Sequence, residues 1–481
     1  MNKYIYKITL IFLVSVTALS CSDFLDVEPK DKILESNTFQ TESGIVNVHN
    51  ELYIQLDKYS LYGGQLTMDA VEVLGQQYNI STNHSQAKMV TYSYAEPAPK
   101  STMEGIWQAA YSTIFLSNQF IENTVKYKGV ISEEKASLLK GEAMAIRAML
   151  HFDLLRLFGP IYKVNSSLPA IPYYDSVATS TNPIISAKDV VTKVLADLDA
   201  SLILLQNDPV LTTGKYAATS AYDGNPYYSS NRGLRMNYLA VKCLKARVLL
   251  YSGDKVGAST VANEVISFTK STPFFPWTPF FAATDSANPD RIFSSENFFA
   301  LSDNNLYLKQ EALFDSNLGD NDIYAPLLSR INAVFESNDN DYRNLPSWRI
   351  PAVGGKTQKT FFKYADVTDK NKNFRLQIPM LKLSEMYLIA AETATTSAEG
   401  IAFLNTLRFN RGLPNLASNA VVATEVAKEY KKEFIGEGQL FFYYKRNNST
   451  TIPKGNVASG NVAMTALQYV VPLPESELNF H

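Results

Sequence analysis

Apolar positions recur with a helical period along much of the chain. Between residues 135 and 160 they follow one another at steps of three and four, at Leu139, Ala143, Ile146, Leu150, Leu154 and Leu157. This spacing puts them on one face and predicts a long helix, which should end at Gly159-Pro160 because proline cannot continue a helix. Alanines at 143, 145 and 148 would let a second helix pack closely against it.

Two later segments, residues 239–268 and 381–412, each contain two apolar-periodic stretches separated by a short break. The breaks fall at Ser252–Asp254 and near Thr395–Ser397. Both segments are typical of tetratricopeptide-type helix pairs. Because no regular 34-residue repeat connects them, they predict part of a mainly α-helical scaffold and not a continuous solenoid.

Long segments without helical periodicity interrupt this pattern at residues 208–234, 271–300 and 336–355. They contain many aromatic residues beside Gly, Pro, Asn or Ser. Loops beyond about 15 residues are usually functional or disordered, and aromatic-rich segments are poor candidates for disorder. We therefore expect one domain over residues 36–481, in which helical parts at 36–207 and 235–481 carry these three loop insertions.

The N-terminus has the features of an export signal. Lys3 and Lys7 precede an apolar stretch that ends in small residues at Ser20, and this stretch is shorter than the about 20 residues that span a bilayer. We therefore predict a signal peptide over residues 1–20.

The residue after that segment, Cys21, is one of only two cysteines; the other, Cys243, lies on an apolar helical face and is expected to be buried. Ala18-Leu19-Ser20-Cys21 resembles a bacterial lipobox, although such motifs usually carry Leu where Ala18 stands. This resemblance predicts lipidation of Cys21 and a lipidated spacer over residues 21–35, with plain secretion as the alternative. Several acyl chains would anchor the protein durably, because each buried CH₂ contributes about 0.8 kcal/mol.

Charge and motif content exclude several classes of function. The net charge of -3 comes from 44 basic and 47 acidic residues without long like-charge blocks, which argues against a nucleic-acid partner. The segment 353–357 ends like a phosphate-binding loop, but the earlier glycine of that pattern falls on Ile350. The four histidines are scattered, and the oxygen-rich segment 338–342 lacks the glycine and glutamate of a calcium loop. We predict neither a cofactor nor a metal.

Candidate acids exist, but their setting favours structural roles. Glu142, Glu385 and Glu392 lie in apolar helical segments, where we expect them to form ion pairs with Arg147 or Arg408. By the same reasoning His151 is expected to be a packed core residue and not a base. The protein is therefore predicted not to be an enzyme, and a secreted hydrolase or a helical-repeat adaptor for other proteins is kept as an alternative.

Several motifs in fixed order resemble the SusD/RagB family of outer-membrane nutrient-binding lipoproteins. They are "CSDFLDVEP" after the signal, "IWQAAYSTIFLSNQFIE", "GEAMAIRAMLHFDLLRLFGPIY", "MNYLAVKCLKARVLLYSGD", "LKLSEMYLIAAE" followed by "FLNTLRFNRGL", and the terminal "VVPLPESEL". The chain departs from the family at Met144, where many relatives carry a basic residue. It also carries Leu440, Phe441, Tyr443 and Tyr444 where Arg, Trp, Asp and Leu are more usual.

The resemblance implies a fold and a function. It implies a SusD-like helical scaffold, lipid-anchored in the outer membrane and facing the cell exterior, which acts as a lid on a SusC-like TonB-dependent transporter. It also implies capture of oligosaccharides, or of peptides in some branches, without cleavage. Aromatic faces would stack on sugar rings, beside polar groups that bind hydroxyls. The candidate ligand-binding residues, chosen from segments rich in Gly, Pro and Asn, are Tyr62, Tyr78, Asn79, Tyr227, Tyr228, Trp277 and Trp348.

Overall fold

The computed structural model describes residues 38–178, 180–216 and 225–480. The predicted signal peptide, Cys21 and the spacer lie outside the described residues, as do residues 217–224 of the first predicted insertion. Within the described ranges, no helix combines the length and the apolar character needed to cross a membrane.

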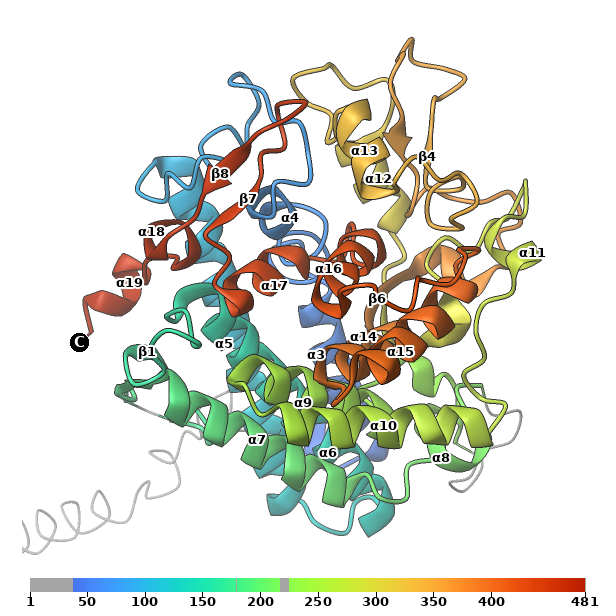
Figure 1. Ribbon diagram of the computed structural model, residues 1–481. Helices are drawn as coiled ribbons and strands as arrows, with labels where there is room; N and C mark the ends of the chain where they lie inside the picture. The colour runs from blue at the N-terminus through green and yellow to red at the C-terminus, as the bar shows by residue number, and fades with distance from the viewer. Residues whose placement is uncertain (1–37, 179, 217–224, 481) are drawn as a thin grey trace, which may run out of the picture.

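Helices make up most of the architecture, and α6 packs against α5 and α7 while α9 packs against α10 (Figure 1). The longer helices are α3 (Glu42–Leu56), α5 (Pro97–Lys126), α6 (Glu133–Phe158), α7 (Ala187–Leu204), α9 (Tyr238–Ser252), α10 (Lys255–Ser271), α12 (Leu306–Phe314), α14 (Leu383–Thr393), α15 (Ser397–Phe409), α16 (Val422–Glu433) and α17 (Leu440–Asn447). The shorter ones are α4 (Ala70–Leu74), α8 (Val210–Thr213), α11 (Phe280–Ala283), α13 (Leu328–Val334), α18 (Ala466–Tyr469) and α19 (Glu475–Leu478). The prediction of a mainly α-helical fold is confirmed.

The described strands form four short antiparallel pairs. These are β1 (Pro169–Pro172) with β2 (Ile184–Ser186), β3 (Asn297–Ser302) with β6 (Gln377–Lys382), β4 (Trp348–Arg349) with β5 (Thr360–Phe361), and β7 (Thr451–Pro453) with β8 (Asn461–Ala463). The sequence did not predict β3. Its residues Phe298, Phe299 and Leu301 are buried, so the end of the second predicted insertion is a core strand and not a loop.

The long helix that the apolar spacing predicts is α6. Ser132 caps its first turn by accepting a hydrogen bond from the Lys135 N–H, and the helix ends at Gly159 as expected. The three alanines are fully buried, and α5 and α7 both pack against α6. Small buried side chains are compatible with the close helix packing that the sequence predicted.

Both predicted helix pairs are confirmed. Helix α9 ends at Ser252, Gly253 adopts a left-handed conformation with φ of 88°, and Asp254 caps α10 through the Gly257 N–H. In the second pair α14 ends at Thr393, and Thr396 forms a reciprocal capping box with Glu399 at the start of α15. Cys243 of α9 is buried in the hydrophobic core, as expected.

His151 is a core residue whose two ring nitrogens both have partners. Nδ1 lies 2.9 Å from the Arg147 carbonyl oxygen, and Nε2 accepts a hydrogen bond from the Tyr174 N–H at 3.1 Å. The ring also stacks on Tyr173, with centroids 3.8 Å apart. Burial lowers the pKa of His151 from its ordinary 6.5 to about 3, so the imidazole is neutral in the folded protein.

This lowered pKa predicts a loss of stability in acid. Because the unfolded chain binds a proton at His151 below pH 6.5 and the folded one does not until about pH 3, the unfolding free energy should fall as the pH drops through this window. Between pH 6.5 and 4.5 the loss from this residue should be about 2–3 kcal/mol. Urea unfolding at several pH values should show a shallower slope for His151→Gln. Equal slopes in the two proteins would contradict the assignment.

Candidate functional site

A large hollow lies between α12 and the segments that follow β4 and β5. Figure 1 shows α12 and β4 in the upper part of the molecule. Its volume is about 510 Å³. Helix α12 contributes Tyr307 and Glu311, residues 349–353 form a second wall, and Phe362 and Asp366 form a third. This volume falls within the range of pockets that bind small molecules.

The walls of this first hollow are fixed by specific contacts. Gln310 of α12 donates from Nε2 to the Phe361 carbonyl at 2.7 Å and accepts from the Tyr364 N–H at 3.2 Å. Gly354 has φ of 81°, and a Cβ there would lie 2.5 Å from the Ser316 carbonyl oxygen. Only glycine fits so close an approach in this conformation. The second wall is therefore held against the segment that follows α12.

The chemistry of the lining is mixed. The Arg349 guanidinium lies over the Phe362 ring, 4.2 Å from its centroid, and both side chains reach the hollow. Tyr307 is half-buried. Asp366 accepts a hydrogen bond from Arg375 Nε at 2.7 Å, which holds the pKa of that carboxyl well below its usual range. Aromatic faces thus lie beside hydrogen-bond donors and ionised acceptors, a set that suits a hydroxyl-rich ligand.

A second, smaller hollow of about 120 Å³ lies on the other side of β4. Trp348 lines this hollow, whereas its neighbour Arg349 lines the first, since consecutive strand residues point to opposite sides. Gln76, Gln77, Arg330, Lys428 and Lys431 add polar groups to its otherwise largely apolar lining. Helices α13, α16 and α17 supply much of the wall.

A chain of buried aromatic rings connects the two hollows beneath the β4–β5 hairpin. Trp348 stacks on Phe361 at 4.4 Å, Phe361 meets Phe314 at 5.1 Å, and Phe314 meets Tyr78 at 5.9 Å between centroids. Two of the predicted ligand residues, Tyr78 and Trp348, therefore pack in the aromatic chain that supports the hairpin. Aromatic contacts of this kind stabilise a core beyond the area that they bury.

Four of the seven predicted ligand residues have rings that the protein covers. The exposed fractions are 3% for Tyr62, 0% for Tyr78, 0% for Tyr228 and 2% for Trp348. The Tyr62 hydroxyl donates to Asp153 at 2.7 Å, and the Tyr78 hydroxyl donates to the Met68 carbonyl at 3.0 Å. In this arrangement these rings anchor segments to the scaffold, Trp348 also lines the second hollow, and a ligand-binding role for the four residues stays a prediction.

The other three predicted residues are half-buried and lie apart from one another. The Tyr227 hydroxyl is 2.8 Å from His49 Nδ1, and the Trp277 ring packs 5.1 Å from that of Tyr387. Asn79 donates its N–H to the Ala325 carbonyl, two residues from Gln77 of the second hollow. The seven residues do not form one site.

The residues that line the first hollow were missed by the sequence reasoning. Tyr307 lies within a helix, and Phe362 and Arg349 meet only because β4 pairs with β5. A search for aromatics beside Gly, Pro and Asn cannot find them. One signal was present in the sequence: the dipeptide Trp348-Arg349 places an aromatic residue beside a cation directly before Ile350-Pro351. In the structure the Trp348 ring is buried and Arg349 is exposed.

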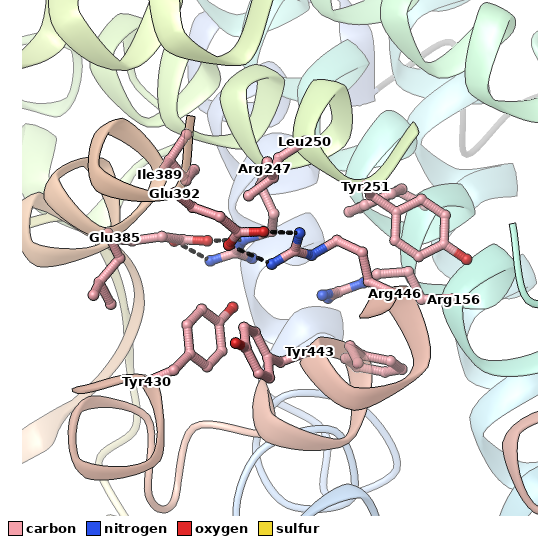
Figure 2. A pocket seen from close by; sticks show the side chains of 13 residues that line it. Arg156, Arg247, Leu250, Tyr251, Glu385, Ile389, Glu392, Tyr430, Tyr443 and Arg446 are labelled. Atoms are coloured by element: carbon pink, nitrogen blue, oxygen red, sulfur yellow. Dashed lines mark hydrogen bonds and ion pairs between the residues drawn. The ribbon is translucent and has the colours of Figure 1, made fainter. Parts of the chain in front are cut away.

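A third cavity, among α6, α9, α14 and α17, holds a concentration of charge, but it is structural (Figure 2). Arg247 Nε donates to Glu385 at 2.7 Å, and Arg446 Nη1 donates to Glu392 at 2.6 Å. The cavity measures about 20 Å³, which is room for about one water molecule. Its charges are matched within the protein.

The predicted ion pairing of the helical glutamates is confirmed, but the partners differ from those expected. Glu142 pairs with Arg232, and the arginines named from the sequence pair elsewhere: Arg147 with Asp197 and Arg408 with Glu429. The Asp341 carboxylate in the oxygen-rich segment is bound by its neighbour Arg343 at 2.6 Å. The position of a glutamate in an apolar helix does not determine which arginine it pairs with. The pairs form between elements that are far apart in the sequence and are brought together by packing.

Comparisons with known proteins agree with this fold. Residues 23–222 match a family model described as "Starch-binding associating with outer membrane", and residues 304–479 match a model described as "SusD family". The chain is 24% identical over 196 residues to SusD-like protein P2 of Formosa agariphila, a match that covers 40% of this chain and 36% of that protein. The chain thus matches about a third of the length of this curated relative.

Solved structures show the same fold over nearly the whole chain. A SusD superfamily protein from Bacteroides thetaiotaomicron has a TM-score of 0.73 and 18% identity, covering 91% of this chain and 98% of that one. A laminarin-binding SusD-like protein has a TM-score of 0.63 and 17% identity, covering 92% and 98%. With two family models matching in order along the sequence, the chain belongs to the SusD/RagB family.

Proposed function

We propose that this protein captures oligosaccharides and passes them to a partner TonB-dependent transporter without cleaving them. The observation that carries the proposal is the first hollow, where Tyr307, Phe362 and Arg349 share a 510 Å³ space with carboxylates. Aromatic faces bind the apolar side of a sugar ring while charged and polar groups bind its hydroxyls. Family membership and the laminarin-binding relative support a glycan over other small molecules.

The proposed function also includes a place for the protein at the outer membrane. Lipidation of Cys21 would hold the protein at the outer membrane, facing the cell exterior, with the transporter as its partner in the same membrane. The lipobox-like sequence before Cys21 and the family description support this placement. Mass spectrometry that finds an unmodified Cys21 in mature protein, or failure to co-purify with a transporter from outer membranes, would count against it.

The binding function is tested with purified protein and a panel of neutral oligosaccharides, laminarin oligomers included, and peptides. The double variant Tyr307→Ala, Phe362→Ala should bind the preferred oligosaccharide about 10-fold to 100-fold more weakly by calorimetry, because two stacking faces are lost. Phe281→Ala is the matched control, since that ring is 75% exposed and lines neither hollow.

Three outcomes would contradict the proposal. Cleavage products in the incubated oligosaccharides would indicate a hydrolase. Binding of peptides alone would transfer the same lid role to a peptide ligand. Unchanged affinity in the double variant, with thermal unfolding showing that it is folded, would exclude the first hollow as the binding site.

A further inference from the structure

Cations without a counter-ion among the described residues line the second hollow. Arg330 and Lys431 both line it, and burial together with the nearby Arg330 lowers the pKa of Lys431. The Arg330 guanidinium donates to the backbone carbonyls of Val457 and Gly460, each at 2.8 Å. Both acceptors are neutral, so these bonds orient the guanidinium and leave its charge without a counter-ion among the described residues.

Lys431 differs from the lysines on either side of it in α16. Lys428 pairs with Glu336 at 2.9 Å, and Lys432 pairs with the same carboxylate at 2.8 Å. Within the described ranges, no carboxylate lies at ion-pair distance from the Lys431 ammonium, and it donates no hydrogen bond. Its side chain forms part of the lining of the second hollow.

A third donor lies in the same lining. The side-chain nitrogen Nε2 of Gln77 is buried, and among the described residues it has no hydrogen-bond acceptor. A buried donor without a partner is energetically unfavourable, so such groups normally have a ligand or water to bind. Two unmatched cations and one unmatched amide thus border a space of about 120 Å³.

We propose that the second hollow binds an anionic substituent, a carboxylate or a sulfate ester, of the captured glycan. This inference rests on the proposed glycan-binding function and narrows it to acidic glycans. A carboxylate or sulfate supplies only acceptors, which matches a lining whose unmatched groups are all donors. Water or a sugar hydroxyl would satisfy the donors but would leave the two positive charges uncompensated. The two hollows share the strand β4, because Trp348 lines this one and Arg349 lines the first.

The test uses probe pairs that differ only in charge. Oligogalacturonate is compared with its methyl ester, and sulfated carrageenan oligosaccharides with their desulfated forms, by calorimetry on the full mature chain. The charged member of at least one pair should bind 10-fold to 100-fold more tightly than its neutral counterpart. The pair that shows the preference distinguishes a carboxylate from a sulfate ester.

Lys431→Gln should remove this preference without affecting folding, because among the described residues the ammonium forms no ion pair or hydrogen bond. Arg330→Gln should reduce it as well, and Lys255→Gln, an exposed lysine at the start of α10, should leave it unchanged. Equal affinities within both pairs, or a preference that survives in Lys431→Gln, would overturn the inference. Binding of laminarin alone would overturn the inference of an acidic glycan but would leave the proposed glycan-binding function intact. Binding of no glycan at all would contradict both the inference and the proposed function.

Discussion

Arg232→Met is expected to lower the unfolding free energy by about 3–5 kcal/mol, a large part of the total stability of a typical domain. Arg232 is fully buried and donates to Asp208 from Nε at 2.9 Å and from Nη2 at 2.7 Å. It also donates to Glu142 from Nη1 at 2.5 Å. Methionine fills similar space but would leave two buried carboxylates without a cation.

Chemical denaturation of the variant measures this loss. The triple variant Arg232→Met, Glu142→Gln, Asp208→Asn should recover part of the stability, because it removes the unpaired charges together with the arginine. Lys193→Met breaks an ion pair with Asp175 in which both side chains are about half exposed, and it should cost no more than about 1 kcal/mol. A single variant as stable as the wild type would refute the importance of the buried triad.

Arg411→Met should also cost about 3–5 kcal/mol, and its effect should be concentrated on the second predicted insertion. The buried Arg411 guanidinium donates to Glu296 at 2.7 Å and to Glu433 at 2.8 Å. Glu296 in turn accepts from the Thr278 N–H at 2.9 Å. The arginine therefore ties residues 278–296 to the end of α16, and hydrogen exchange there should become faster in the variant.

Two comparisons make this result specific. Arg411→Lys keeps the charge but loses the fork that reaches both carboxylates, so its stability should be intermediate. Glu433 keeps Arg343 at 3.0 Å and Lys382 at 3.4 Å as partners in either variant, whereas Glu296 loses its arginine. If hydrogen exchange rose equally throughout the protein, the proposed local anchoring would be incorrect.

The local pattern of apolar residues and helix-ending residues was sufficient to predict the helical scaffold. Apolar spacing predicted α6, and the breaks at Gly253 and Thr396 followed from residues that end and cap helices. These features depend on interactions within one or two turns, so neighbouring residues contain the information. The resemblance to the SusD/RagB family extended the prediction of the fold to the whole chain, because the motifs of the family occur in a fixed order.

The candidate site depended on contacts between distant segments. Trp348 and Arg349 are neighbours in sequence, yet pairing of β4 with β5 buries the ring and exposes the cation. Glu385 pairs with Arg247, which is 138 residues away in the sequence. Among the described residues, Lys431 has no carboxylate partner, whereas Lys428 and Lys432 of the same helix both pair with Glu336. The sequence by itself determined the helices, their ends and the family. Only the tertiary structure decided which rings face solvent and which charges remain unmatched, because burial and ion pairing depend on packing between elements far apart in the chain.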